Sequence, residues 1–467
     1  MWSLGRVAGV LRMFLMGVVA GAMAQAEPGP RALVPLRYRL TNNVFQEVGD
    51  LPGQRLSPLP QPGETLASQP AYVSDRPLYL KATLGQGPDS QYTLVLDASK
   101  GPGREYDTLY LDRNNDESLA DEQPIRGYRR DGATWFGPIP LLLPGKNGPY
   151  LYHLLTIYRS QGGSGPTVEL QSAGYYLGRA SLGEGRHPLA LVDANGNGVF
   201  NDLSTGPEEG DRLLIDLNDD GLFETESEES EEVYRLSAFL PVQDRYYTLT
   251  LPPEGGTLAV AEPQLAFGTL RSRWAPFWIQ LSSDQGFFHF HSREPELRIP
   301  VGTYRLHACA VEVKDAQGHV WKGFGRFPSR KGELVIRRRE TTFLDLGPPL
   351  KVEAVPQVQN DQVEFRLHVT GGAGEEYQEI FRNGVRVPPP RLRIAEAPDR
   401  QVGLYDFFYR RGGECTLLWQ HPQRRSGRFT ATVDFSLGPL SPGPSSTVSF
   451  EIKPLPRELI QRRGSPK

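Results

Sequence analysis

Short runs of leucine, β-branched and aromatic residues, separated by glycine, proline, asparagine and aspartate, recur along most of this chain. The run Val363–Val369 alternates apolar and polar side chains, which is the pattern of a strand with one buried face. Long stretches with apolar residues at helical spacing are hard to find. The chain has 50 glycines and 41 prolines among 467 residues, which is below the roughly 25–30% of low-complexity sequences. The pattern therefore predicts a folded, all-β protein.

The length of the chain predicts several units, because a domain usually has roughly 100–200 residues. The segment after the leader is rich in Pro, Gly, Gln and Ser, with one expected strand at Tyr38–Leu40. Farther along, Val311–Lys314 and His319–Trp321 flank a turn and predict a hairpin. The predicted units are a signal peptide (1–26), an irregular lead-in (27–75), a β region with three Asp/Asn-rich loops (76–262), a small β-sandwich (263–345), an immunoglobulin-like β-sandwich (346–453) and a basic tail (454–467).

The N-terminus has the features of a secretory leader. Arg6 and Arg12 precede the apolar run Met13–Met23, and Ala24-Gln25-Ala26 then gives the small-residue spacing of a signal-peptidase site. The apolar run is about half of the roughly 20 residues that a membrane-spanning helix needs. We therefore expect cleavage after Ala26, or after Ala24, and a secreted, periplasmic or cell-surface protein with no stable membrane span.

Negative charge is concentrated in one segment. Between Glu208 and Glu232 there are twelve carboxylates and one base, Arg212. The formal net charge of −4 becomes −6 when a leader with two arginines is removed. Such a concentration of one sign repels itself unless water, salt or a cation compensates it. No basic motif or aromatic-basic platform occurs in the sequence, so nucleic acid is not expected as a partner.

Only two cysteines occur, Cys309 and Cys415. Export would permit a disulfide, but the two fall in different predicted units. Two separate thiols are therefore favoured over one bridge.

Three segments share one arrangement, in which a short apolar strand runs directly into Asp-x-Asn-x-Asp/Asn. They are loop 1 (112–117), loop 2 (193–198) and loop 3 (216–221). Oxygens on alternate residues of a tightly curled loop point inward, a glycine permits the sharp turn after the third ligand, and calcium takes six to eight such oxygens. The candidate ligands are Asp112, Asn114 and Asp116 with Asp121 in loop 1; Asp193, Asn195 and Asn197 with Asn201 or Asp202 in loop 2; and Asp216, Asn218 and Asp220 with Glu224 or Glu226 in loop 3.

The three loops do not match the calcium pattern equally. Loops 2 and 3 have the glycine, whereas Glu117 stands there in loop 1, which favours a distorted site or a plain turn. The alternative for all three is an ordinary Asx-rich turn. None has the glutamate at the twelfth position of an EF-hand loop, and entry from strands argues against helix–loop–helix pairs. Loops 2 and 3 are close in sequence, so we expect either two nearby ions or one shared acidic pocket.

The chain resembles a group of uncharacterised secreted bacterial β-rich proteins with EF-hand-like or dockerin-like calcium loops. The resemblance rests on three sequence segments: residues 106–112, 191–198 and 214–221. It covers about 75–260, and the C-terminal segment with Gly347–Leu350 is similar to the end modules of such proteins. The resemblance implies the class of protein and its export only, because the group has no activity to transfer; Ca²⁺ as the cofactor is predicted from the loop residues themselves, and an enzymatic activity is the less favoured expectation.

Catalytic signatures do not occur in the sequence. There is no Gly-x-Ser-x-Gly elbow and no His-Glu-x-x-His. His289 and His291 share one face of a predicted strand, yet the sequence shows no third zinc ligand, which favours packing histidines. Trp274 and Trp278 would form either a sugar-stacking surface or, as we favour, a core or domain contact.

Two function classes follow. The favoured one is a noncatalytic exported protein whose β domains are stiffened by calcium and which binds a cell-surface protein or polysaccharide. The other is a carbohydrate- or cell-wall-active protein with a dispersed site. An acidic and aromatic cleft away from the loops would favour the second class.

Overall fold

The computed structural model of the chain is built almost entirely of strands, at 54% strand and ~2% helix, so the all-β prediction is confirmed. The predicted signal peptide and basic tail lie outside the residues that the structure describes. The described residues are 31–41, 43–62, 66–160, 165–207, 209–227, 229–328, 333–396, 400–410, 413–423, 425–435, 437–441 and 446–453.

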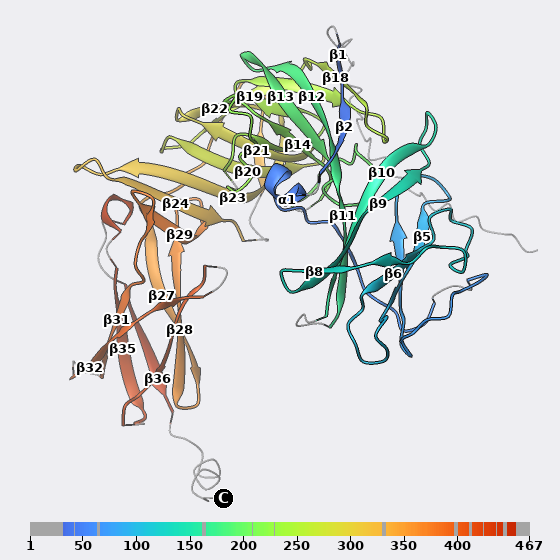
Figure 1. Cartoon of the computed structure of the whole chain (residues 1–467). Helices are drawn as coiled ribbons and strands as arrows, with labels where there is room; N and C mark the ends of the chain where they lie inside the picture. The colour runs from blue at the N-terminus through green and yellow to red at the C-terminus, as the bar shows by residue number, and fades with distance from the viewer. Residues whose placement is uncertain are drawn as a thin grey trace, which may run out of the picture.

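The first half of the chain forms four antiparallel sheets around one continuous core that extends from Val34 to Val260 (Figure 1). The first sheet contains β1 (Ala32–Pro35), β18 (Thr257–Ala261), β17 (Arg245–Thr250) and β16 (Leu240–Val242). The second contains β3 (Gln54–Leu56), β11 (Thr167–Ser172), β10 (Tyr150–Arg159), β9 (Ala133–Leu143) and β8 (Tyr128–Arg130). The third contains β15 (Val233–Arg235), β14 (Arg212–Ile215), β13 (Gly185–Val192), β12 (Gly174–Leu182) and β2 (Arg37–Leu40). The fourth contains β4 (Leu78–Thr83), β5 (Gln91–Asp97), β6 (Thr108–Leu111) and β7 (Ile125–Arg126).

The lead-in has more secondary structure than expected. The expected strand at Tyr38–Leu40 is confirmed as β2, but β1, β3 and the short helix α1 (Val44–Val48) form there as well. The three lead-in strands join three different sheets, pairing with β18, β12 and β11. Each partner lies far along the chain, so the local sequence pattern does not reveal the pairing.

The second half of the chain is organised by one large sheet. Its strands are β21 (Gly286–Ser292), β20 (Phe277–Ser283), β23 (Gly302–Lys314), β24 (Val320–Arg326), β29 (Glu376–Arg382), β28 (Gln362–Thr370), β34 (Cys415–Gln420) and β33 (Phe408–Tyr409), with β25 (Glu333–Ile336), β27 (Lys351–Gln359) and β30 (Val385–Arg386) attached. Two smaller sheets pack beside it: β22 (Glu296–Pro300), β19 (Phe267–Arg271) and β26 (Thr341–Phe343); and β32 (Arg400–Asp406), β31 (Arg391–Glu396), β35 (Gly427–Asp434) and β36 (Thr447–Ile452). A 3-10 turn, Gly438–Leu440, precedes β36.

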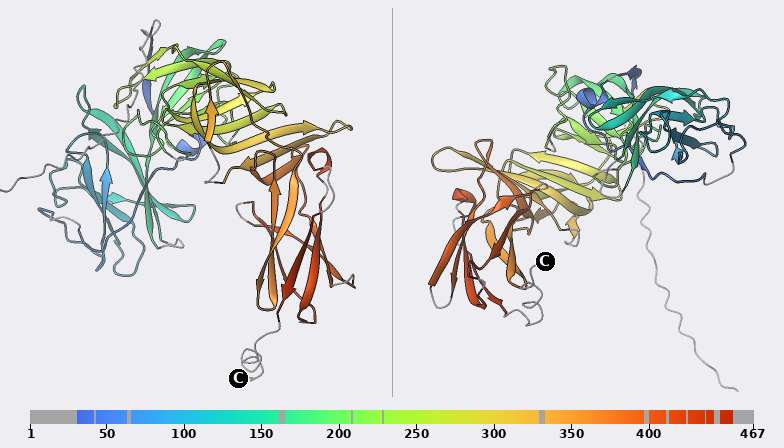
Figure 2. Two further views of the ribbon diagram at one scale, coloured as in Figure 1. Left: turned by 180° about the vertical axis from the view of Figure 1, so that it is seen from behind. Right: turned by 60° about the horizontal axis from the view of Figure 1, so that its bottom comes forward.

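The hairpin predicted from Val311 to Trp321 is confirmed, with Lys314 opposite Val320. The large sheet continues past residue 346, because β24 pairs with β29. The two larger cores of this half lie around Phe288 and Val311 and around Phe365 and Trp419, and a small third cluster contains Trp278. In Figures 1 and 2 the orange-red C-terminal strands lie apart from the light-blue strands β5 and β6, whereas the blue strands β1 and β2 lie among the green and yellow strands with which they pair.

Both cysteines are buried, and neither forms a disulfide. Cys309 lies in the core of the middle strands and Cys415 in the core of the last strands. Two separate thiols, the favoured prediction, are what the structure contains. Within the described part of the chain, no helix is long and apolar enough to cross a membrane.

Candidate metal-binding loops

Each of the three Asp/Asn-rich loops follows the C-terminal end of a strand. Loop 1 follows β6, loop 2 follows β13 and loop 3 follows β14. Because β13 and β14 pair antiparallel, with Leu189 opposite Ile215, loops 2 and 3 leave opposite ends of the same hairpin. The antiparallel pairing thus separates two loops that are close in sequence and does not favour a shared acidic pocket.

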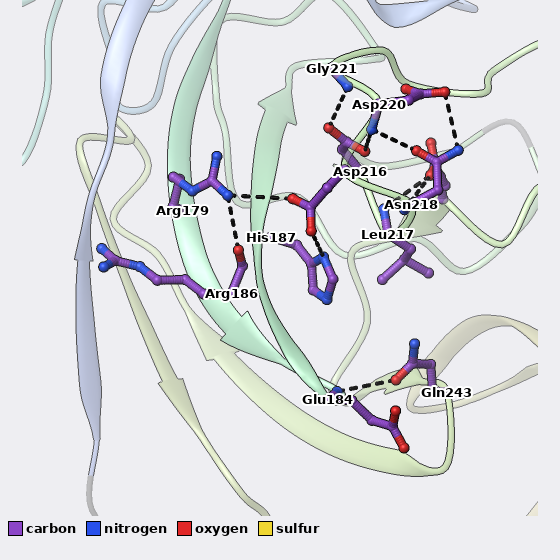
Figure 3. A network of polar contacts seen from close by, with 12 residues as sticks. Arg179, Glu184, Arg186, His187, Asp216, Leu217, Asn218, Asp220, Gly221 and Gln243 are labelled. Carbon is purple, nitrogen blue, oxygen red and sulfur yellow. Dashed lines mark hydrogen bonds and ion pairs between the residues drawn. The ribbon is translucent and has the colours of Figure 1, made fainter.

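The three loops have the same hydrogen-bond network around the aspartate at their first position. The backbone N–H of the sixth residue donates to that aspartate in every loop: from Glu117 to Asp112 at 3.0 Å, from Gly198 to Asp193 at 2.7 Å, and from Gly221 to Asp216 at 3.0 Å. The N–H of the fifth residue reaches both this aspartate and the third-position asparagine. The N–H of the seventh donates to the side chain of the fifth. Figure 3 shows the contacts of Asp216 with Gly221 and Asp220 and those between Asp220 and Asn218.

The backbone conformation is also shared, with positive φ at the fourth and sixth positions. The fourth residues are Asn115 at 56°, Gly196 at 69° and Asp219 at 57°. The sixth residues are Glu117 at 64°, Gly198 at 82° and Gly221 at 85°. Loop 1 therefore adopts the conformation of the other two although Glu117 replaces the glycine, and it does so at the steric cost of a side chain in the left-handed region.

The residues predicted as additional ligands of each loop differ in whether they contact that loop. Asp202 accepts hydrogen bonds from the amides of both loop 2 asparagines, whereas the Asn201 amide turns to the carbonyl of Leu251. In loop 3 the Asn218 amide nitrogen lies 3.2 Å from Asp220 and 3.4 Å from Glu224. In loop 1 Asp121 accepts from the Ser118 hydroxyl. No contact connects the exposed Glu226 with loop 3 in the described residues.

The three loops share one further feature that the sequence pattern did not predict. In each loop the N–H of the second residue donates to a carboxylate outside the loop: from Arg113 to Glu122 at 2.7 Å, from Ala194 to Asp211 at 3.2 Å, and from Leu217 to Glu232 at 3.0 Å. The residues Glu232 and Asp211 are buried. These carboxylates hold the start of each loop through a backbone N–H. Because their separation from the loop in sequence varies, no fixed motif contains them.

Loops 1 and 3 occupy equivalent places in two similar hairpins. The segments 107–116 and 211–220 both read Asp-x-Leu-x-Leu/Ile-Asp-x-Asn-x-Asp. The leading aspartate of each accepts backbone N–H groups from the connection before it: Asp107 from Ser99 at 2.8 Å, and Asp211 from Asp202 at 2.9 Å. This repeated ten-residue pattern is the sequence signal that could have predicted the similar positions of loops 1 and 3.

The loops differ in the oxygen lone pairs that they leave free. In loop 2 the four donors to Asp193 are Gly196, Asn197 and Gly198 through their N–H groups and Tyr152 through its hydroxyl. A carboxylate has about four lone-pair sites, so Asp193 is saturated. In loops 1 and 3, Asp112 and Asp216 accept the N–H groups of the fifth and sixth residues, and Asp112 also interacts with the N–H of Asn115. Within the described residues, neither has a side-chain donor equivalent to the Tyr152 hydroxyl. Loops 1 and 3 therefore fit a cation better than loop 2.

Burial dominates the electrostatics of loop 2. Removal from water raises the pKa of Asp193 to about 6. Burial, followed by the charges of Asp193 and Asp202, raises the pKa of Asp211 well above its usual range. Loop 3 is open instead: Asp216 is buried, but Asn218 and Asp220 are exposed. Asp219 instead forms ion pairs with Arg179 at 3.4 Å and with His187.

Among the described residues, no group of three or more His, Cys, Asp or Glu side chains converges closely enough to hold a metal ion. The oxygens of loops 1 and 3 come instead from a mixture of carboxylate and amide, which is the donor set of a hard cation. His289 and His291 do share one face of β21, opposite Gln280 and Trp278. No protein-family model matches the chain, and no curated protein matches it.

Proposed function

We propose that this protein is an exported, noncatalytic, calcium-binding protein whose ions occupy loops 1 and 3 and hold the following segments on the sheets. The observation that supports it best is the recurrence of one loop structure at equivalent ends of two hairpins, with Asp112 and Asp216 each keeping free lone pairs. A structural turn needs only the backbone bonds. In this proposal the side chains of Asn114, Asp116, Asn218 and Asp220 supply the further oxygens for the cation.

Calcium is the ion that suits these donors. Each loop offers only carboxylate and amide oxygens, and it offers no thiolate or imidazole of the kind that zinc prefers. Calcium accepts irregular sets of six to eight oxygens, completed by carbonyls and water. The irregular arrangement of Asp220 and Glu224 around the Asn218 amide is compatible with that tolerance.

Loop 2 has a different role in this proposal. The amides of Asn195 and Asn197 donate to Asp202, and Asp193 is saturated by four donors. The amide bonds alone do not set loop 2 apart, because the Asn114 and Asn218 amides likewise donate to Asp116 and Asp220. The difference is that its four donors leave Asp193 without a lone pair for a cation. Loop 2 therefore holds the β13–β14 connection without metal.

Calcium at loop 3 would act on the acidic segment, which we define as residues 224–232. Glu232 at its end accepts the N–H groups of both Leu217 and Glu224, so loop and segment are one unit. An ion beside Asp216 and Asp220 would offset the repulsion among these carboxylates. Binding to the folded state alone stabilises it by mass action.

Export agrees with this use of calcium. Extracellular modules bind calcium at roughly 0.1–1 mM, a range in which the ion serves structure and not signalling. The leader at 1–26 supports a secreted, periplasmic or cell-surface location, where a surface protein or a polysaccharide would be the partner.

The test is calorimetric titration of calcium into the mature chain, residues 27–467, after treatment with chelator. We expect two sites with dissociation constants of roughly 0.1–1 mM and a higher melting temperature with calcium. Absence of binding heat together with identical melting in calcium and in EDTA would refute the proposal. Magnesium at equal concentration is the control for a general ionic effect.

A further inference from the structure

A groove away from loops 1 and 2 lies on the outer face of the large sheet. Its cavity has a volume of about 800 Å³, within the range of ligand sites. Strand pairing places His291, Trp278 and Ala310 opposite one another across β21, β20 and β23. Their neighbours along β20 and β23, Phe277 and Val311, belong to the core of the middle strands and also border the groove.

The floor of the groove contains polar groups that the chain itself leaves without a partner. Trp278 is only 4% exposed, and in the described structure its indole Nε1 has no hydrogen-bond partner. The Nε2 of His291, in the same wall, also has none. Burial lowers the pKa of His291 to about 4, so the ring is a neutral donor and acceptor near pH 7. A buried donor without an acceptor is unfavourable, so a ligand with polar groups suits this floor.

The charges around the groove balance. Three carboxylates line it and three bases oppose them: Glu229, Glu231 and Glu312 against Arg293, Lys314 and Lys322. One pair is already joined, because Glu229 of the acidic segment forms an ion pair with Lys322 of β24. A balanced rim does not favour a ligand of high net charge. Hydroxyl groups, which both donate and accept, match such a mixture of neighbours.

The walls supply apolar surface next to these polar groups. Trp274 lines the groove and is half-buried, and its own indole N–H is bound to the carbonyl of Pro348 at 2.9 Å. The indole ring is therefore held in place while part of it stays accessible. Small residues, Ala308 and Ala310, pack beside Trp278 and leave room above the sheet.

We propose that this groove binds a neutral glycan, with sugar hydroxyls hydrogen-bonded to Trp278, His291 and the rim carboxylates and with sugar C–H faces against Trp274. A saccharide needs an aromatic ring held in place for its C–H faces, and hydrogen-bond donors and acceptors beside that ring for its hydroxyl groups. A second cavity, of about 560 Å³, shares Glu231 and His291–Arg293 with the first, so the groove has room for several linked sugars.

The groove is also connected to loop 3. Glu229 and Glu231, which line one wall, belong to the acidic segment whose end, Glu232, supports loop 3. This connection rests on the proposed function: calcium at loop 3 orders the segment and thereby the wall. Glycan binding is then stronger with calcium than with EDTA.

The experiment titrates neutral pentasaccharides of β-glucan, α-glucan, xylan, mannan and galactan type into the mature chain with calcium, and hexalysine in parallel. We expect at least one saccharide to bind, and His291→Ala to weaken its binding at least tenfold at an unchanged melting temperature. Glu312→Ala is the second groove variant. The matched control is His368→Ala, a half-buried histidine on β28 that should leave the saccharide affinity unchanged.

Three results would overturn the glycan proposal. They are binding of no saccharide, binding of hexalysine alone, which would indicate a groove for basic peptides, and saccharide binding that His291→Ala and Glu312→Ala leave unchanged. Repetition in EDTA separates the two proposals. Saccharide binding that depends on His291 but not on calcium refutes only the connection to loop 3, whereas missing calcium heat refutes the proposed function.

Discussion

Glu232 and Leu217 lie 15 residues apart in sequence, yet the Glu232 carboxylate accepts the Leu217 backbone N–H at 3.0 Å. The same carboxylate accepts the N–H of Glu224 at 2.9 Å. One buried side chain thus joins the start of loop 3 to both ends of the acidic segment. Glu122 and Asp211 make the corresponding bond in loops 1 and 2. The support behind each loop is therefore a common part of its construction.

Replacement of Glu232 with alanine should destabilise the protein, because the backbone N–H groups of Leu217 and Glu224 would lose their acceptor near the protein interior. We expect a loss of roughly 1–3 kcal/mol in the free energy of unfolding, measured by urea denaturation in EDTA. Glu232→Gln keeps one acceptor oxygen and should lose less. Glu231→Ala, an exposed neighbour, is the control. Equal stability of Glu232→Ala and Glu231→Ala would contradict the supporting role.

The positive φ of the sixth loop position predicts a graded response to substitution. A Cβ at Gly221 meets no atom within 4 Å, so Gly221→Ala should cost only the conformational strain, about 1 kcal/mol. A Cβ at Gly198 would lie 2.4 Å from Leu143, so Gly198→Ala should cost more. Glu117→Gly should stabilise loop 1 slightly. Thermal melting of the three variants tests this order, and a larger loss for Gly221→Ala than for Gly198→Ala would be inconsistent with it.

Removal of one loop aspartate should remove one calcium site. Asp112→Asn and Asp216→Asn each lose a charged ligand, so calorimetry should count one site in either variant and none in the double variant. The shift of melting temperature with calcium should fall in parallel. Asp131→Asn, an exposed aspartate outside the loops, should behave as the unaltered protein. Full calcium binding by the double variant would show that the ions bind elsewhere.

Two histidines predict a pH dependence. Burial, then the charges of Arg235, His291 and Arg212, lowers the pKa of His289 to about 3, and burial followed by Lys322 lowers that of His291 to about 4. In the unfolded chain both have a pKa of about 6.5. The unfolded state therefore binds more protons between about pH 4 and 6.5, and stability falls as the pH falls through that range.

The double variant His289→Gln/His291→Gln should flatten this dependence, because neither glutamine takes up a proton. Urea denaturation at pH 7 and pH 4.5, both in EDTA, measures the change. We expect a smaller loss of stability at low pH in the double variant than in the unaltered protein. An equal loss in both proteins would assign the acid sensitivity to other groups.

Much of the local structure was predictable because its determinants are close in sequence. The bonds from the fifth and sixth residues to Asp112 and Asp216 span four or five positions, so the spacing of Asp and Asn alone indicated the loops. The hairpin at Val311–Trp321 was predictable for the same reason. Alternation of apolar residues likewise indicated strands, since a half-buried strand repeats every two residues.

Distant partners were decided by the tertiary structure alone. Nothing near loop 3 in sequence singled out Glu232, one of many carboxylates in its segment, because burial against the Leu217 N–H is what distinguishes it. The separation of loops 2 and 3 followed from the antiparallel pairing of β13 with β14, and the groove from the meeting of His291, Trp278 and Ala310 across three strands. Sequence spacing determines contacts within a turn, whereas contacts between strands depend on register, which the whole core selects.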